Sequence, residues 1–166
     1  MTRRARARHT ARMTDWLDIA LCYDPATRRA DIALGADGDL LLDETPATAM
    51  LITLGSDRRA RADDVLPTGL SALSRPTSLV ERRGWAGDAL DRDGARIGTR
   101  LWLLDRAKES DLTLLMAAQW LKEGYGWVAD ETGDPAAIDV AFARAGVLAV
   151  SVAIAGESVR ITRRVA

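Results

Sequence analysis

Residues 136–154, "AAIDVAFARAGVLAVSVAI", decide the class of fold that this chain can adopt. Apolar residues alternate with small or polar ones on both sides of "ARAG", and a period of two is typical of strands that bury one face. The glycine-containing break between the two runs predicts a β-hairpin. The stretch "SVRITRRV" (158–165) predicts a further strand. This end of the chain is therefore expected to form antiparallel sheet.

A helix is predicted immediately before the hairpin, within "SDLTLLMAAQWLKEGYGWVAD" (110–130). Ser110 is expected to cap its first turn. Gly124 and Gly126 each cost about 1 kcal/mol in a helix interior, so they predict a kink or an early end. Apolar residues recur at the helical period and predict one buried face. That face consists of Leu114, Ala117, Leu121 and Val128, widened by Met116, Trp120 and Trp127.

The first third of the chain has weaker patterns. Between residues 16 and 43, short alternating runs separated by Asp24-Pro25 and residues 35–38 predict two or three short antiparallel strands. The stretch 45–54, "TPATAMLITL", predicts a helix with Thr45 as N-cap and Pro46 at the first helical position. The side chains expected to be buried in this helix are Ala49, Leu51, Ile52 and Leu54.

A long charged loop is predicted over residues 55–96. From 57 to 96 the chain carries seven acidic residues and eight arginines, with neither a helical nor a strand pattern. Loops longer than about 12–15 residues are uncommon and are usually functional or disordered. Because the charges balance, we expect an ordered loop that faces a partner. The stretch 96–109 then predicts a short helix with Ile97, Leu101 and Leu104 inward.

These patterns together predict one α+β domain over residues 14–166, with short antiparallel strands, two or three helices and one long charged loop. The length of 166 residues suits a single domain, which needs neither a disulfide nor a metal to fold. Cys22 is the only cysteine and is expected to be buried and inert. No apolar run approaches the eighteen residues that a membrane-spanning helix needs.

Charge is unevenly distributed along the chain. The whole carries 23 basic and 24 acidic residues, a net charge of −1, and five arginines lie within residues 1–12. The remainder therefore has a net charge of −6, which is unsuited to binding a phosphate backbone. Residues 1–13 are expected to be a disordered basic tail. Arginine accounts for 21 of the basic residues, and its planar guanidinium suits ion pairs at interfaces.

Residues able to carry catalysis are few. His9 is the only histidine and lies in the basic tail, which excludes Ser-His-Asp and Cys-His arrangements and histidine-rich metal sites. Acidic residues cluster at 63–64 and 88–93, but arginines flank them. A general acid needs a pKa raised by an apolar pocket, whereas neighbouring arginines lower it. We therefore expect no enzymatic activity, no cofactor and no metal.

One tryptophan of the loop lacks periodic apolar neighbours. Trp85 lies between Gly84 and Gly87, and it could pin the loop to its own domain or insert into a partner. Arg100 and Trp102 are expected to clamp the loop to the helices. Interface hot spots are enriched in tryptophan, tyrosine and arginine. The residues predicted to form the interface are Asp57, Arg58, Arg59, Arg82, Arg83, Gly84, Trp85, Gly87 and Asp88.

Three stretches resemble one phage family in order and spacing: "WLDIALCYDPATRRADIAL" (16–34), "GDLLLDETPATAMLITLGSDRRARADDVLP" (38–67) and "RRGWAGDALDRDGARIGTRLWLLDRAKE" (82–109). They resemble the Mu-type bacteriophage baseplate proteins, the products of gene forty-six, and more distantly the small wedge proteins of T4-type baseplates. The resemblance is strong from Thr14 to Glu109 and looser to Ile154. It departs at Ala86, where the family usually has an aromatic residue.

The resemblance implies a structural wedge subunit of a contractile tail baseplate, located in the virion and assembled in the cytoplasm of the bacterial host. Its partners would be other wedge proteins and the central hub or sheath proteins, within a multi-copy hetero-oligomer. Two other functions stay open: a carboxylate-based peptidoglycan hydrolase of the tail, and a nucleic-acid adaptor acting through the arginine-rich tail. The family tends to begin near Met13, so residues 1–12 are an extension or the product of an upstream start.

Overall fold

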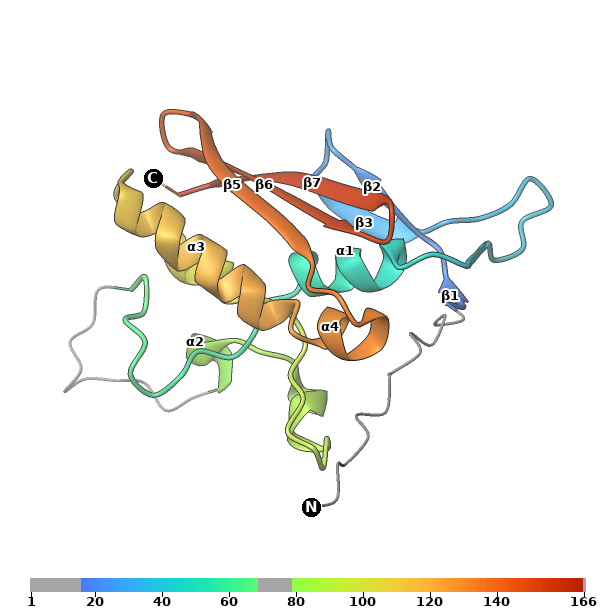
Figure 1. Ribbon diagram of the computed structural model, residues 1–166, viewed down its shortest axis with the longest axis horizontal. Helices are drawn as coiled ribbons and strands as arrows, with labels where there is room; N and C mark the ends of the chain where they lie inside the picture. Colours follow the sequence, from blue (N-terminus) through green and yellow to red (C-terminus); the bar gives the residue numbers. More distant parts are fainter. Residues whose placement is uncertain (1–15, 69–78, 166) are drawn as a thin grey trace, which may run out of the picture.

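The computed structural model describes residues 16–68 and 79–165, which form a single α+β domain. A three-stranded sheet lies on one side of the helices α1, α3 and α4, and residues 79–96 of the charged loop lie on the other side (Figure 1). The predicted fold class is confirmed. The predicted tail, residues 1–13, lies outside the described residues.

The sheet has the antiparallel order β5 (Ala137–Arg144), β6 (Val147–Ile154) and β7 (Glu157–Arg164), so the predicted hairpin and final strand are confirmed. Alternate residues of a strand point to opposite faces. On the central strand β6, one face is therefore fully buried while the other is only partly covered. The buried side chains of β6 are Leu148, Val150, Val152 and Ile154.

Helix α3 (Asp111–Gly124) packs on the sheet at β5, and α4 (Trp127–Thr132) follows it after a break at Tyr125 and Gly126. Ser110 Oγ accepts a hydrogen bond from the backbone N–H of Thr113 at 3.3 Å, so the predicted cap and early end are confirmed. The predicted apolar face is wrong at Met116, which is 38% exposed because it lies at the edge of the covered stripe.

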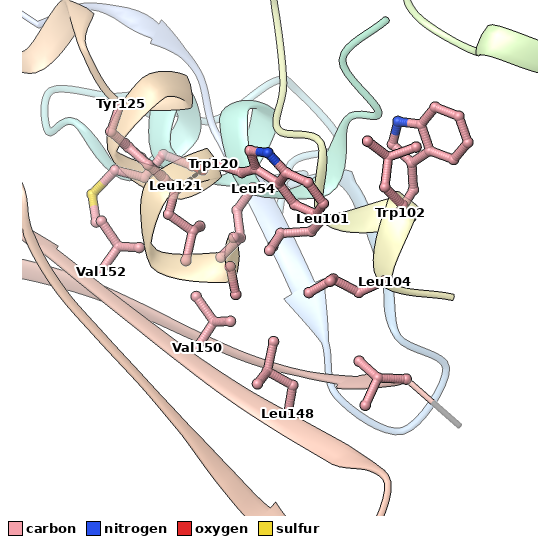
Figure 2. Packing of buried hydrophobic residues seen from close by; sticks show 14 of the residues in the cluster. Leu54, Leu101, Trp102, Leu104, Trp120, Leu121, Tyr125, Leu148, Val150 and Val152 are labelled. Carbon is pink, nitrogen blue, oxygen red and sulfur yellow. Dashed lines mark hydrogen bonds between the residues drawn. The ribbon is translucent and has the colours of Figure 1, made fainter. Parts of the chain in front are cut away.

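A single core joins these layers (Figure 2). The hydroxyl of the buried Tyr125 donates a hydrogen bond of 2.8 Å to the carbonyl oxygen of Met50, and burial raises the pKa of that hydroxyl above its ordinary value. The tyrosine therefore remains a donor between α1 and the end of α3. The core side chains labelled in Figure 2 are Leu54, Leu101, Trp102, Leu104, Trp120, Leu121, Tyr125, Leu148, Val150 and Val152.

Helix α1 (Ala47–Gly55) begins one residue later than predicted, with Pro46 as its N-cap. Thr45 Oγ1 still accepts a hydrogen bond from Ala47 N at 3.2 Å. Of the residues predicted to be buried, Leu54 is buried, Ala49 and Leu51 are partly buried, and Ile52 is exposed, so the prediction is wrong at Ile52. Almost every position of this helix is apolar, so periodicity alone could not select the face that packs on α3 and β7. The residues that are buried are Thr48, Met50, Thr53 and Leu54.

The N-terminal region forms four short strands in two ribbons, rather than the two or three strands predicted. Strand β1 (Asp18–Ile19) pairs with β4 (Leu42–Asp43), and β2 (Leu21–Asp24) pairs with β3 (Arg29–Ile32). Cys22 is exposed, so the prediction that it is buried is wrong. Among the described residues, these ribbons contribute no side chain to the buried core, although β2 contacts α1.

The charged loop contains two short helical turns, α2 (Leu79–Arg82) and η2 (Ala86–Ala89), that the sequence did not predict. The predicted helix over 96–109 is reduced to the 3₁₀ turn η3 (Leu101–Leu104), and Ile97 is exposed rather than inward. The reason is Gly98, whose φ of +87° ends any regular helix and whose added Cβ would lie 2.4 Å from the Ser56 carbonyl oxygen.

Candidate protein-docking surface

Arg100 holds the charged loop against helix α3. Its Nη1 lies 2.7 Å from Asp64 Oδ1 in the loop, and its Nη2 lies 2.5 Å from Glu123 Oε2 at the end of α3. The Arg100 side chain is 6% exposed. The N–H donors of a guanidinium form a rigid planar fork. A guanidinium that binds two carboxylates in a largely buried site therefore fixes the positions of both carboxylates relative to each other. The loop and the helix are therefore held in one relative position.

Glu123 is the centre of this network. Besides Arg100, its carboxylate binds Arg61 at 2.8 Å and Arg58 at 3.4 Å. Burial raises the pKa of Glu123, but the hydrogen bond and charge of Arg100, with help from Arg61, lower it by more, so the net pKa lies below the usual value. The carboxylate is therefore kept ionised by arginines from both ends of the loop sequence, Arg58 and Arg61 near its start and Arg100 after its end.

Sequence reasoning missed Glu123, although one signal was present. An acidic residue in the last turn of a helix faces the negative end of the helix dipole, which is unfavourable unless cations compensate it. Glu123 occupies such a position in α3. The sequence indicated Asp64 only as one of a cluster of acidic residues flanked by arginines, and in the structure it pairs with the more distant Arg100.

Trp102 anchors the loop to the core from η3. It is 2% exposed, and its Nε1 donates a hydrogen bond of 2.8 Å to the carbonyl oxygen of Arg58. The guanidinium of Arg83 lies over the same indole, 4.6 Å from the ring centroid, and also pairs with Asp57 at 2.6 Å. An arginine in this position is attracted by the face of the ring as well as by the carboxylate.

Two of the arginines predicted to lie at the interface make contacts within the chain. The Arg58 side chain is 13% exposed and donates to Glu123 and to the Arg96 carbonyl oxygen. Arg82 donates to the carbonyl oxygens of Ala60 and Arg61, at 3.3 Å and 2.6 Å. Both side chains therefore stabilise the shape of the loop.

The segment around Trp85 depends on two glycines. Gly84 allows the backbone conformation before the tryptophan, and Gly87 leaves room for its ring. Gly84 has a φ of +100°, and a Cβ added there would lie 2.6 Å from the Cβ of Arg59. A Cβ added at Gly87 would lie 2.3 Å from the Trp85 ring, so the indole lies directly on that glycine. Trp85 is nevertheless 59% exposed. The tryptophan is thus positioned by its own turn and presented to the outside.

A groove of about 510 Å³ lies beside Trp85 and is lined by η2, α1 and the end of α3. At its wall, Asp88 Oδ1 accepts a hydrogen bond from Ile97 N at 3.2 Å, while Asp88 Oδ2 is buried without a partner. Trp127 lines the same groove. The predicted residues Trp85 and Asp88 thus line the same groove, and Gly87 lies against the Trp85 ring. Arg59 and Arg82 line a neighbouring hollow instead, which shares part of its wall with the groove.

The described residues offer little for acid–base or metal chemistry. Hydrogen bonds lower the pKa of Asp24, and they outweigh burial to lower the pKa of Asp43 as well, as arginines do for Glu123. A general acid needs the opposite shift. Within residues 16–68 and 79–165, no group of three histidine, cysteine, aspartate or glutamate side chains could hold a metal ion, and no helix is long and apolar enough to cross a membrane.

Comparison with known proteins decides the family. The family model described as "Phage protein GP46" matches residues 46–160, from the start of α1 into β7. The chain belongs to this phage GP46 family. Over 112 residues it is 41% identical to the baseplate protein gp46 of Escherichia phage Mu, a match that covers 67% of each chain. No solved structure matches the chain.

A second GP46 relative is the Mu-like prophage FluMu protein gp46 of Haemophilus influenzae, which is 29% identical over 114 residues, covering 69% of this chain and 67% of that protein. The resemblance to Mu-type proteins and the predicted function as a structural baseplate component are confirmed by these matches. The family model does not extend to residues 14–45, where part of the resemblance was expected.

Proposed function

We propose that this GP46-family chain is a wedge subunit of a contractile phage tail baseplate, and that it acts by binding proteins rather than by catalysis. Its partners would be other wedge proteins and the central hub or sheath proteins, in a multi-copy hetero-oligomer located in the virion tail and assembled in the host cytoplasm. The support is the family membership together with a surface suited to docking.

The exposed Trp85 is the observation that carries the proposal. A tryptophan buries about 150–250 Å² on full burial, which at about 25 cal/mol per Å² stabilises a complex by about 4–6 kcal/mol as an upper bound. Since 59% of Trp85 is still exposed, a little over half of that gain is available to a partner. Of the two expectations for this residue, insertion into a partner is thus the better supported.

The internal ion pairs make this surface suitable for binding. Arg100, Asp64 and Glu123 hold the loop from one side, and Trp102 holds it from the core. A surface that is already ordered loses less conformational entropy when a partner binds. The arginines of the loop therefore favour assembly mainly by holding the neighbourhood of Trp85 in place, and Arg83 and Asp57, which remain partly exposed, are the charged residues proposed to contact the partner.

The test compares Trp85→Ala with Leu115→Ala, which removes a side chain that is 68% exposed on α3 and does not line the groove. Each variant is expressed in the phage background, and assembled baseplates are isolated and probed for the chain. We expect Trp85→Ala to be lost from baseplates while its melting temperature stays that of the wild type. Normal incorporation of the Trp85 variant would disprove the proposed interface.

Two further measurements address the absence of catalysis and of nucleic-acid binding. Purified protein is incubated with bacterial cell walls, and release of sugar fragments would replace the proposal with a hydrolase. DNA retention is compared for the full chain and a variant lacking residues 1–12. Salt-sensitive retention that depends on those residues would instead favour the nucleic-acid adaptor.

A further inference from the structure

We propose that the groove beside Trp85 receives an arginine- or lysine-bearing segment of a partner protein. This inference rests on the proposed function and adds the chemistry of the partner. The groove has a volume of about 510 Å³ and lies between η2, α1 and α3, so a partner segment could contact more than the Trp85 ring there.

The first argument is charge. Two arginines line the groove, and one of them, Arg58, is already bound to Glu123. The free arginine is Arg96, whose guanidinium has no ion-pair partner among residues 16–68 and 79–165. The lining is therefore net negative, in line with the charge of −6 outside the first twelve residues. The acidic residues in the lining are Asp18, Asp88, Asp91, Glu123 and Asp130.

The second argument is the presence of two indoles in the same lining. Trp85 is exposed. Trp127 is held in position, because its Nε1 donates to Thr53 Oγ1 at 3.2 Å and Trp16 packs edge-on against it at 5.8 Å between ring centroids. Arginine and lysine are attracted to the face of an indole, and their aliphatic stems pack on apolar walls. Ile52 and Ile97 provide such walls.

The third argument is an unused acceptor. Asp88 Oδ2 is buried without a hydrogen-bond partner, while Oδ1 of the same carboxylate is bound to the backbone. The guanidinium of Arg58 attracts the Asp88 carboxylate by its charge, but it donates no hydrogen bond to it. Buried polar atoms of native proteins are nearly always paired. A donor brought into the groove by a partner, with a small shift of the η2 turn, would pair this oxygen.

The lining also selects against other classes of ligand. Phosphate groups of nucleic acids or of lipids would meet net negative charge at the groove. A segment of a protein can combine cationic side chains with apolar ones, as the mixture of carboxylates, indoles and aliphatic side chains requires. One basic segment belongs to the chain itself, since five arginines lie within residues 1–12, and the test must separate it from a partner.

The experiment titrates the purified full chain with an octapeptide of alternating arginine and alanine, followed by tryptophan fluorescence and calorimetry. The matched peptide of alternating glutamate and alanine is the control. We expect saturable binding of the arginine peptide alone, and an affinity that falls as salt is added. A double variant, Asp91→Asn with Asp130→Asn, should weaken binding about fivefold to tenfold, whereas Asp139→Asn on the far face of β5 should not.

Three results would overturn the proposal. These are failure of the arginine peptide to bind, binding that the double variant does not weaken, and binding seen only after residues 1–12 are deleted. The last result would assign the groove to the chain's own arginines. The titration needs no other baseplate protein, so it can fail while Trp85→Ala still abolishes assembly. Conversely, normal assembly of Trp85→Ala would disprove the proposed interface without altering the titration of the isolated chain.

Discussion

The indole nitrogen of Trp102 lies 2.8 Å from the carbonyl oxygen of Arg58 and donates a hydrogen bond to it across 44 positions of sequence. Trp102 belongs to the core, whereas Arg58 lies near the start of the charged loop. The bond therefore joins the packing of the domain to the conformation of its docking surface. Variants of the core should disturb both, and variants of Trp85 should disturb only binding.

Two replacements of Trp102 should lower the free energy of unfolding by different amounts. Trp102→Ala removes a large buried ring and is expected to cost about 3–5 kcal/mol. Trp102→Phe keeps much of the packing but leaves the Arg58 carbonyl oxygen without its donor, which costs about 1–3 kcal/mol. Trp85→Ala should stay within about 0.5 kcal/mol of the wild type. Urea denaturation measures all three, and equal losses for Trp85 and Trp102 would contradict this division of roles.

Replacement of Arg100 by methionine should be strongly destabilising. The change leaves the carboxylates of Asp64 and Glu123 without their shared cation, and removing one member of a buried ion pair costs about 3–5 kcal/mol. Adding Glu123→Gln should recover part of the loss, because one uncompensated charge disappears. Arg160→Met, on the exposed side of β7, is the control for loss of an arginine. A loss in Arg100→Met no larger than in the control would refute the clamp.

Acid should weaken the domain partly through Glu123. The pKa of this carboxyl in the folded chain lies below its ordinary value of 4.5, so its contribution to stability is complete above that pH and disappears as the pH falls through the folded-state pKa. The free energy of unfolding, measured between about pH 3 and pH 6, should therefore fall toward low pH. Glu123→Gln should be less stable near neutrality and have a shallower pH dependence. An unchanged slope in that variant would show that Glu123 contributes nothing.

Gly87→Ala should displace the Trp85 ring without unfolding the domain. The added Cβ would lie 2.3 Å from the indole, whereas Gly55→Ala meets nothing within 4 Å and serves as the control. In protein labelled with fluorotryptophan, five fluorine resonances are expected, one for each tryptophan. The resonance that is absent from Trp85→Phe should shift most in Gly87→Ala and little in Gly55→Ala. A shift of equal size in both variants would be evidence against contact between the ring and Gly87.

Much of the fold could be predicted because the signals are local. Ser110 caps α3 through a hydrogen bond three residues away, and the alternation of β5 and β6 follows directly from the geometry of a strand. Helix α1 shows the limit of such reasoning. Its nearly uniform apolar composition predicted a helix, but it could not indicate that Met50 rather than Ile52 would be buried.

The candidate site was only partly predictable, because the roles of its charges depend on distant partners. The sequence singled out Trp85, Arg100 and Trp102 by residue type and spacing. It could not separate Arg58, which turns inward to Glu123, from Arg83, which stays partly exposed, since both belong to the same kind of charged dipeptide. The pairing of Arg58 with Glu123 spans 65 positions, and no local pattern encodes it.

The α+β class, the hairpin, the capped helix and the phage family could all be recognised from local sequence, since caps, turns, periodicity and long unusual motifs are properties of neighbouring residues. Three features became evident only in the folded chain: which arginines stabilise the loop, how Gly87 supports Trp85, and that acidic residues from four segments line one groove. The physical reason is that charge and burial act through space. Two residues far apart in the chain share a carboxylate or an apolar wall only after the core has brought them together.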